Sequence, residues 1–169
     1  MPKDIDIIIY GATGFTGQLC VKYFQSLNTG VKWAIAGRNQ QKLQKVALDN
    51  SVEVDILIAD SDDEAALDML TSRAKVILST TGPFHRYGSK LVASCVKNSA
   101  NYVDITGENF WVKDLIAKHH EEASAKGIRI IPSCGYDSIP SDLGVFYSAK
   151  ALNKPIKRNF RSLLFYFRK

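Results

Sequence analysis

The chain has 169 residues, of which 46% are hydrophobic and 23% charged, a composition typical of an ordinary soluble globular domain. These values exclude disordered, fibrous and disulfide-rich classes, and the length is enough to bury a full core without a metal or a disulfide. The three cysteines, Cys20, Cys95 and Cys134, lie far apart and form no CxxC pair. This spacing favours a reducing compartment and argues against a structural metal.

Charge is distributed unevenly along the chain. Lysine and arginine total 22 against 17 acidic residues, a net charge of +5, but six of the basic residues and none of the acidic ones fall in residues 154–169. Because the rest of the chain is close to neutral, we expect no nucleic-acid partner.

No apolar run reaches the 18 residues of a membrane span, and Lys3 and Asp4 interrupt the start of the chain where a signal peptide would be apolar. We therefore expect an intracellular, cytoplasmic protein.

Apolar runs and helical periodicities alternate along the chain. Strands are predicted at 5–10, 31–36, 52–59, 74–80, 102–105 and 128–133, and helices at 15–28, 39–50, 61–70, 87–98, 109–126 and 140–152. In the first helix Phe15, Leu19, Tyr23 and Leu27 recur every four residues and indicate its apolar face. Ser61 and Glu64 have the spacing of a capping box at the start of the third helix.

This alternation defines the predicted fold class. Strands that read as continuous apolar runs between helices indicate an α/β protein with a doubly wound, Rossmann-like parallel sheet. We assign residues 1–153 to this domain. Residues 154–169 change to a basic, aromatic composition and are predicted to begin a second domain that is missing or truncated here.

The strongest motif is Gly11-Ala-Thr-Gly14-Phe-Thr-Gly17, directly after the first predicted strand. In a dinucleotide-binding fingerprint the first glycine permits the tight turn, the second lets the backbone approach a pyrophosphate, and the third lets the helix pack on the sheet. The phosphates then lie on free N–H groups at the helix N-terminus. A glycine-rich turn without a ligand is the alternative.

The end of the second strand selects the cofactor. It reads Ala36-Gly37-Arg38-Asn39, with no acidic residue for ribose hydroxyls and with an arginine whose guanidinium can bind a 2′-phosphate. NADP is therefore favoured over NAD, unless Arg38 is only a surface residue at a helix start. Asp60, after the third strand, either borders the adenine or flanks a helix.

The loops after later strands supply the far half of the predicted site. After the fourth strand, Thr81, Gly82 and Pro83 lie where a loop approaches the ribose or nicotinamide. The segments 104–108 (DITGE) and 133–137 (SCGYD) follow the fifth and sixth strands and are further candidates.

Two residues are weak candidates for proton transfer. His85 and Tyr136 each lie on a loop at the expected ligand edge, although a histidine beside an arginine is more often a surface residue. No tyrosine has a lysine four residues later, as in short-chain dehydrogenases, and the two adjacent histidines at 119–120 match no zinc motif.

Five segments together carry a family resemblance: GATGFTG, WAIAGRNQQKL, VILSTTGPFHRYG, NYVDITGE and IPSCGYDSIPSDLG. They resemble the saccharopine dehydrogenase-like oxidoreductases over nearly the whole chain. The resemblance implies an NADP-dependent oxidoreductase in which Gly11, Thr13, Gly14, Phe15, Arg38 and residues 81–83 line the cofactor. It also implies a second α/β domain that shapes the substrate site, and a link to mitochondria, membranes and lipid droplets.

The leading hypothesis is hydride transfer between NADP(H) and a small-molecule substrate. The second is a non-catalytic protein that binds NADP or a lipid surface. Only 16 residues follow Asn153, too few for a lid with its own core, so we expect cofactor binding without turnover. The apolar run at 163–167 predicts self-association through the tail, and its basic neighbours allow a peripheral membrane contact.

Overall fold

The computed structural model describes residues 3–27 and 30–152. The chain divides into two compact units, Met1–Gly135 and Tyr136–Lys169. Each unit is described by itself. The predicted start of a second domain at 154 lies outside the described residues, so that boundary stays a prediction.

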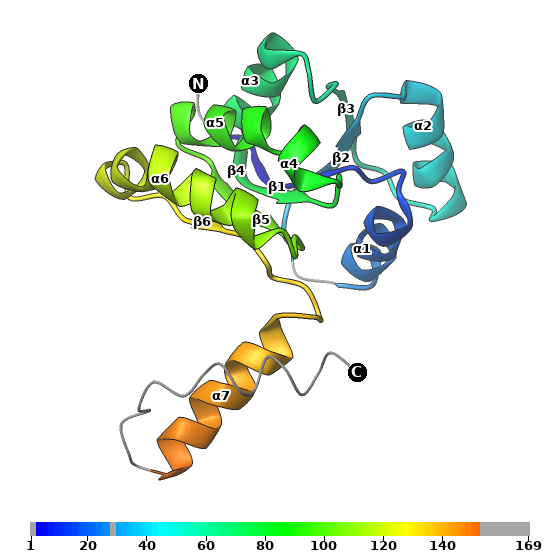
Figure 1. Ribbon diagram of the computed structural model, residues 1–169. Helices are drawn as coiled ribbons and strands as arrows, with labels where there is room; N and C mark the ends of the chain where they lie inside the picture. Colours follow the sequence, from blue (N-terminus) through cyan, green and yellow to red (C-terminus); the bar gives the residue numbers. More distant parts are fainter. Residues whose placement is uncertain (1–2, 28–29, 153–169) are drawn as a thin grey trace. The chain divides into compact units, whose positions relative to one another are not determined.

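The first unit is built on a six-stranded parallel sheet in the order β3-β2-β1-β4-β5-β6 (Figure 1). Its strands pair in parallel at every step, with Ile9 of β1 opposite Ile35 of β2 on one side and Leu78 of β4 on the other. The predicted doubly wound fold is thus confirmed. The strands are β1 (Ile5–Tyr10), β2 (Trp33–Gly37), β3 (Asp55–Ile58), β4 (Ala74–Ser79), β5 (Asn101–Asp104) and β6 (Ile130–Ile131).

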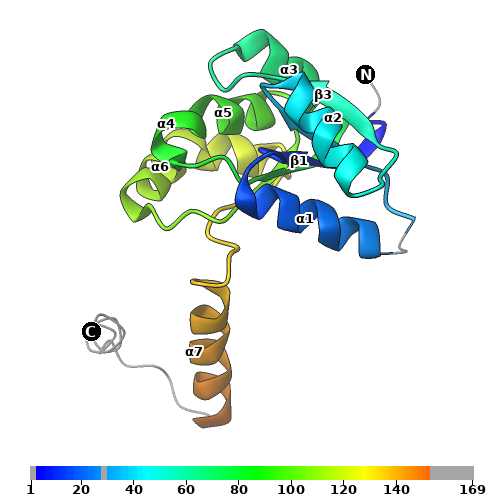
Figure 2. The same cartoon turned by 90° about the vertical axis from the view of Figure 1, so that its right-hand side faces the viewer.

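Helices cover the two faces of the sheet unequally. Right-handed crossovers place the helices of the β1–β2–β3 half on one face and those of the return path on the other. One face therefore packs on Val21 of α1 with Leu43 and Val46 of α2, and the opposite face packs on α3, α5 and α6 (Figures 1 and 2). The helices of the unit are α1 (Phe15–Ser26), α2 (Gln40–Asp49), α3 (Glu64–Arg73), α4 (Phe84–Tyr87), α5 (Ser89–Lys97) and α6 (Asn109–Ala125).

Three local predictions differ from the structure. The four-residue spacing chose the wrong face of α1: Phe15 and Tyr23 are exposed, and the helix buries Gly17 and Val21 instead. The predicted capping box is also wrong, because Asp63 caps α3 by accepting a hydrogen bond from the Ala66 N–H. The helix expected at 87–98 is present as α5, but a further short helix, α4, precedes it in the segment expected to be a loop, and the two meet at a buried Gly88.

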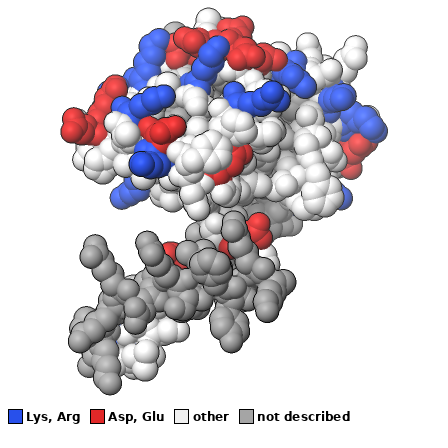
Figure 3. All heavy atoms as spheres, in the orientation of Figure 1, with Lys and Arg blue, Asp and Glu red and all other residues white. Residues whose placement is uncertain are grey.

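The second unit contains one described helix, α7 (Ile139–Leu152). Within the described ranges, no helix is long and apolar enough to cross a membrane. On the face drawn in Figure 3, basic and acidic side chains are interspersed over the first unit.

Candidate functional site

The turn between β1 and α1 contains all three glycines of the motif. Gly11 has a φ of +86°, which L side chains rarely adopt, and a Cβ on Gly17 would lie 2.2 Å from the Gly11 carbonyl oxygen. A Cβ on Gly14 would lie 3.4 Å from that same oxygen, an ordinary contact. The fold thus requires glycine at 11 and 17, whereas at Gly14 the missing side chain leaves room beside the turn.

The N-terminus of α1 offers hydrogen-bond donors next to this room. Gly14 is the N-cap residue, and within the described ranges no side chain caps the helix. The Gly14 N–H donates to the Gly11 carbonyl, and the Gln18 N–H donates to the Gly14 carbonyl. The N–H groups of the first helical turn have no partner inside the helix and carry the positive end of its dipole, so they suit a phosphate.

The loop after β4 packs directly on the glycine turn. Thr80 ties the two segments together, because its N–H donates to the Tyr10 carbonyl and its hydroxyl lies 3.2 Å from the carbonyl oxygens of Tyr10 and Gly11. A Cβ on Gly11 would lie 2.3 Å from Thr81 Oγ1. This oxygen is buried, and among the described residues it has no hydrogen-bond partner. A buried hydroxyl without a partner costs about 1–3 kcal/mol, so a polar group of a bound ligand would satisfy it.

Arg38 and Asp60 follow the two neighbouring strands of the same half. Arg38 is exposed directly after β2, where Asn39 caps α2 through its side chain. Arg38 forms no ion pair with any described residue, so its guanidinium is available for an anion. Asp60 accepts a hydrogen bond from the Asp62 N–H, which is the role of a turn residue. Its predicted contact with adenine stays a prediction.

The β4–β5 half of the edge holds a carboxylate at the start of α4. Glu108 lies in the loop after β5 and accepts hydrogen bonds from the N–H groups of Phe84 and His85, both at 2.8 Å. Glu108 Oε2 is also 2.6 Å from Nδ1 of the His85 ring. Burial raises the pKa of Glu108, but the donors of His85 and Phe84 outweigh it, so the net shift is downward and the group is a carboxylate at neutral pH.

A second carboxylate joins the ends of β5 and β6. Asp104 is buried and accepts hydrogen bonds from the N–H groups of Thr106 and Ser133 and from the Tyr102 hydroxyl, each at 2.9 Å. Burial raises the pKa of Asp104, although these three donors oppose the shift. Asp104 therefore fixes the loop that carries Glu108.

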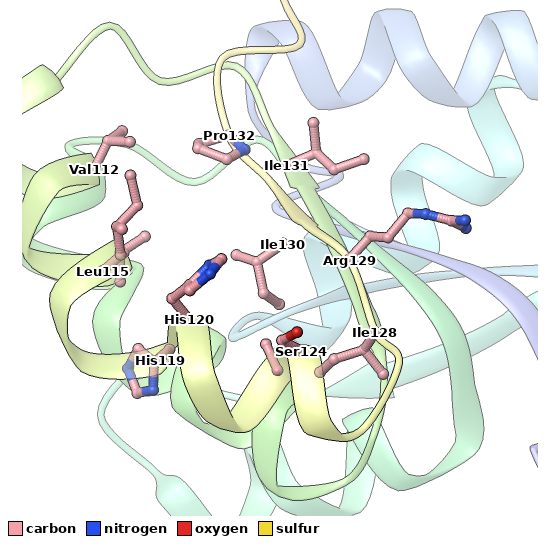
Figure 4. A pocket seen from close by; sticks show the side chains of 12 residues that line it. Val112, Leu115, His119, His120, Ser124, Ile128, Arg129, Ile130, Ile131 and Pro132 are labelled. Atoms are coloured by element: carbon pink, nitrogen blue, oxygen red, sulfur yellow. The ribbon is translucent and has the colours of Figure 1, made fainter.

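Tyr136 is the first residue of the second unit, and its part in the site stays a prediction. The described cavity does not coincide with the glycine turn either. It has a volume of about 350 Å³ and lies between α6 and β6, with the His120 ring pointing toward Ile130 (Figure 4). Most of its lining is aliphatic, and it shares no residue with the predicted cofactor site.

The sequence identified the parts of this site but missed their connections. Thr81 lies against the glycine turn, whereas the expected approach of residues 81–83 to the ribose or nicotinamide stays a prediction. Nothing local indicated that the Thr81 hydroxyl would have no partner among the described residues. Glu108 stood among the candidate strand ends, but its pairing with His85 spans 23 residues and has no sequence signature.

A parallel sheet in this order, with a glycine turn between β1 and α1 at its carboxyl edge, defines a Rossmann-type dinucleotide-binding domain. The family model described as "Saccharopine dehydrogenase NADP binding domain" matches residues 7–131. The chain belongs to this family, and NADP is its cofactor. The predicted resemblance is confirmed.

Curated relatives extend the comparison. Proteins named trans-acting enoyl reductase from Mycobacterium leprae and Mycobacterium tuberculosis are each 39% identical to the chain over 147 residues, or 85% of it. The chain spans about a third (35%) of the length of these relatives.

Solved structures support the fold alone. Saccharopine dehydrogenase (L-Glu forming) from Saccharomyces cerevisiae superposes with a TM-score of 0.65 at 19% identity, covering 79% of this chain and 28% of that one. A short-chain dehydrogenase/reductase family protein gives a TM-score of 0.57 at 16% identity, covering 77% and 73%.

Proposed function

We propose that the chain is the cofactor-binding part of an NADPH-dependent oxidoreductase that reduces a carbon–carbon double bond conjugated to a carbonyl. The NADP-binding family and the relatives named enoyl reductase support an oxidoreductase with a small-molecule substrate. The observation that carries the cofactor-binding part of the proposal is the buried Thr81 hydroxyl, which has no partner among the described residues and faces the Gly11 turn. The double-bond reduction rests on the name of the relatives alone.

The residues divide the binding task between them. The N–H groups at the start of α1 bind the pyrophosphate, with the space at Gly14 allowing its close approach. The Arg38 guanidinium binds the 2′-phosphate, which NAD lacks. The Thr81 hydroxyl, which lies against the Gly11 turn, binds a polar group of the cofactor there, and Gly82 and Pro83 continue the loop toward the ribose or nicotinamide. Thr13, Phe15 and Asp60 border the adenosine half.

When bound, NADPH supplies a hydride. The chain's own residues must orient the cofactor, exclude water and deliver a proton to the carbon next to the carbonyl. Positioning accounts for several kcal/mol of such a reaction, and it needs structure on the substrate side of the nicotinamide. The 169-residue chain is expected to bind NADPH, and turnover is expected where further structure covers the substrate side of the nicotinamide.

Calorimetric titration of the chain with NADPH, NADH and adenosine 2′-monophosphate tests the cofactor assignment. NADPH should bind more tightly than NADH, and adenosine 2′-monophosphate should compete with it. Failure to bind either dinucleotide would remove the proposal.

A chimera tests the reaction. The chain replaces the matching third of the M. tuberculosis relative, and NADPH oxidation is followed with enoyl thioesters, saturated thioesters and ketones. Turnover of enoyl thioesters by the chimera but not by the chain is expected. A chimera that binds NADPH but reduces nothing would favour the alternative of a non-catalytic NADP-binding protein. Association with membranes or lipid droplets and self-association through the tail remain predictions, because residues 153–169 lie outside the described part of the chain.

A further inference from the structure

The contacts of Glu108 distinguish it from the other acidic residues at the carboxyl edge. One oxygen, Oε1, accepts from the Phe84 N–H, and the other, Oε2, accepts from the His85 N–H and faces His85 Nδ1. The backbone N–H and the imidazole ring of His85 are therefore both bound to the Glu108 carboxylate. The Glu108 side chain is only 23% exposed, so water competes little for these contacts.

This arrangement fixes the state of the His85 ring. A carboxylate can only accept, so Nδ1 must be the protonated nitrogen, whether the ring is neutral or charged. In the neutral ring, Nε2 is then the basic nitrogen. The imidazole also packs on Phe110, with ring centroids 5.5 Å apart, so its plane as well as its tautomer is held.

The pair lies beside the predicted cofactor site. His85 follows Pro83 by two residues, on the segment that carries the Thr81 hydroxyl against the Gly11 turn. The His85 side chain is 45% exposed, so it can be reached from solvent or by a substrate. A half-exposed imidazole with a fixed tautomer at this position has the properties of a general acid.

We propose that His85 donates the proton that accompanies hydride transfer and that Glu108 is its positioning residue, a role that rests on the proposed function. In this step the Nε2–H bond of the imidazolium breaks and a C–H bond forms on the carbon next to the carbonyl. The hydride from NADPH adds to the other carbon of the double bond. The ring is left neutral, because Nδ1 keeps its proton and still donates it to Glu108, and a proton from solvent restores the Nε2–H bond. Substrate, hydride and proton balance as the addition of one H₂.

A simpler role for Glu108 is to cap α4. Both roles predict that losing the carboxylate loosens the 83–85 segment. The Nδ1–Glu108 contact fixes the Nδ1–H tautomer, which is the minor form of an unconstrained imidazole, in either role. The proposal requires this tautomer, and only the proposal requires the ring to lie next to bound NADPH.

Nitrogen-15 NMR of the chain labelled at histidine tests both requirements, with the three histidines assigned by single substitutions. In spectra of the neutral ring, His85 should show a protonated Nδ1 and an unprotonated Nε2. Glu108→Gln should move His85 toward the Nε2–H form. The matched control Glu121→Gln, which removes an exposed carboxylate on α6 beside the other two histidines, should leave His85 unchanged.

Titration with NADPH in the same samples separates the two hypotheses. Binding that shifts the His85 ring resonances and leaves those of His119 and His120 unchanged supports the inference. Binding without a change at His85, or a wild-type His85 in the Nε2–H form, overturns the inference and leaves the proposed function standing. No NADPH binding overturns the proposed function, and the inference with it. The wild-type spectra decide these outcomes even if Glu108→Gln does not fold.

Discussion

The two halves of the sheet's carboxyl edge are built in different ways. In the β1–β3 half, the site is backbone: a positive φ at Gly11, a close approach at Gly17 and free N–H groups at the start of α1. In the β4–β6 half, the site is made of side chains that join separate segments: Glu108 accepts a hydrogen bond from the start of α4, and Asp104 accepts one from Ser133 in the loop after β6. The backbone groups of the β1–β3 half therefore suit a dinucleotide, a ligand that many proteins share. The side chains of the β4–β6 half can be altered by single substitutions, which would change the chemistry of the site.

The largest effect is expected from breaking the backbone half. In Gly17→Ala the new Cβ would lie 2.2 Å from the Gly11 carbonyl oxygen and 2.8 Å from Ala12 Cα, and neither backbone atom can move alone. We expect a loss of about 3 kcal/mol or more in the free energy of unfolding, measured by urea denaturation. Gly14→Ala is the matched control, because its Cβ meets only an ordinary contact: stability should change little, while NADPH binding falls more than about 10-fold. Equal stability of the two variants would contradict this account of the turn.

The next effect concerns cofactor choice in the same half. Charge-assisted hydrogen bonds to a phosphate contribute about 1.5–3 kcal/mol each, so Arg38→Ala should weaken NADPH binding roughly 10- to 100-fold and leave NADH binding nearly unchanged. Arg129→Ala provides the control, since Arg129 precedes β6 at the opposite edge of the sheet. An equal loss for both dinucleotides would show that Arg38 acts through folding or through the shared part of the cofactor.

A smaller and opposite pair of effects is expected where the two halves meet. Thr81→Val removes a buried hydroxyl that has no partner among the described residues. The apoprotein should therefore be as stable as the wild type or up to about 1 kcal/mol more stable, while NADPH binding weakens about 2- to 10-fold. Thr80→Val should instead lower the free energy of unfolding by about 0.5–1.5 kcal/mol, because the Thr80 hydroxyl donates to the backbone carbonyls of Tyr10 and Gly11. A loss of stability in Thr81→Val would mean that its hydroxyl already has a partner in the apoprotein.

The β1–β3 half of the molecule could be predicted from the sequence better than the β4–β6 half. Strand β1 matches its predicted bounds, Ile5–Tyr10, because an apolar run buried on both faces is a local signal. The prediction of the apolar face of α1 was wrong because it rested on the spacing of large side chains, whereas this helix packs on the sheet through Gly17, which has no side chain. The glycine turn and Arg38 could be found because their chemistry lies in consecutive residues.

The β4–β6 half could be predicted only in part. Thr81 and His85 were identified as candidates by their position after a strand. Their surroundings depend on packing: the Glu108 contact needs β4 and β5 to be neighbours, and the Asp104 contact with Ser133 needs β6 to follow at the sheet edge. Such pairings are fixed by tertiary structure and leave no mark in a single sequence.

The smallest expected effect tests the buried carboxylate of the second half. Burial raises the pKa of Asp104 in the folded chain above its value in the unfolded chain, which is near 3.9. The folded state therefore holds this proton more tightly, and ionised Asp104 lowers stability at neutral pH. As the pH falls through the folded pKa toward about 4, that cost is relieved, so this group makes folding more favourable in acid.

Asp104→Asn removes this dependence while its amide oxygen still accepts from the Thr106 and Ser133 N–H groups. The difference in unfolding free energy between wild type and variant, measured by urea denaturation from neutral pH to about pH 4, should shift in favour of the wild type as the pH falls. Asp68→Asn serves as the opposite control. The Lys97 and Ser94 hydrogen bonds lower the pKa of Asp68, so its stabilising effect is present above about pH 4 and is lost as the pH falls through its folded pKa. If the two difference curves slope the same way, Asp104 is held as a carboxylate by its three donors, and the β4–β6 half carries its negative charge in the folded protein without a stability cost.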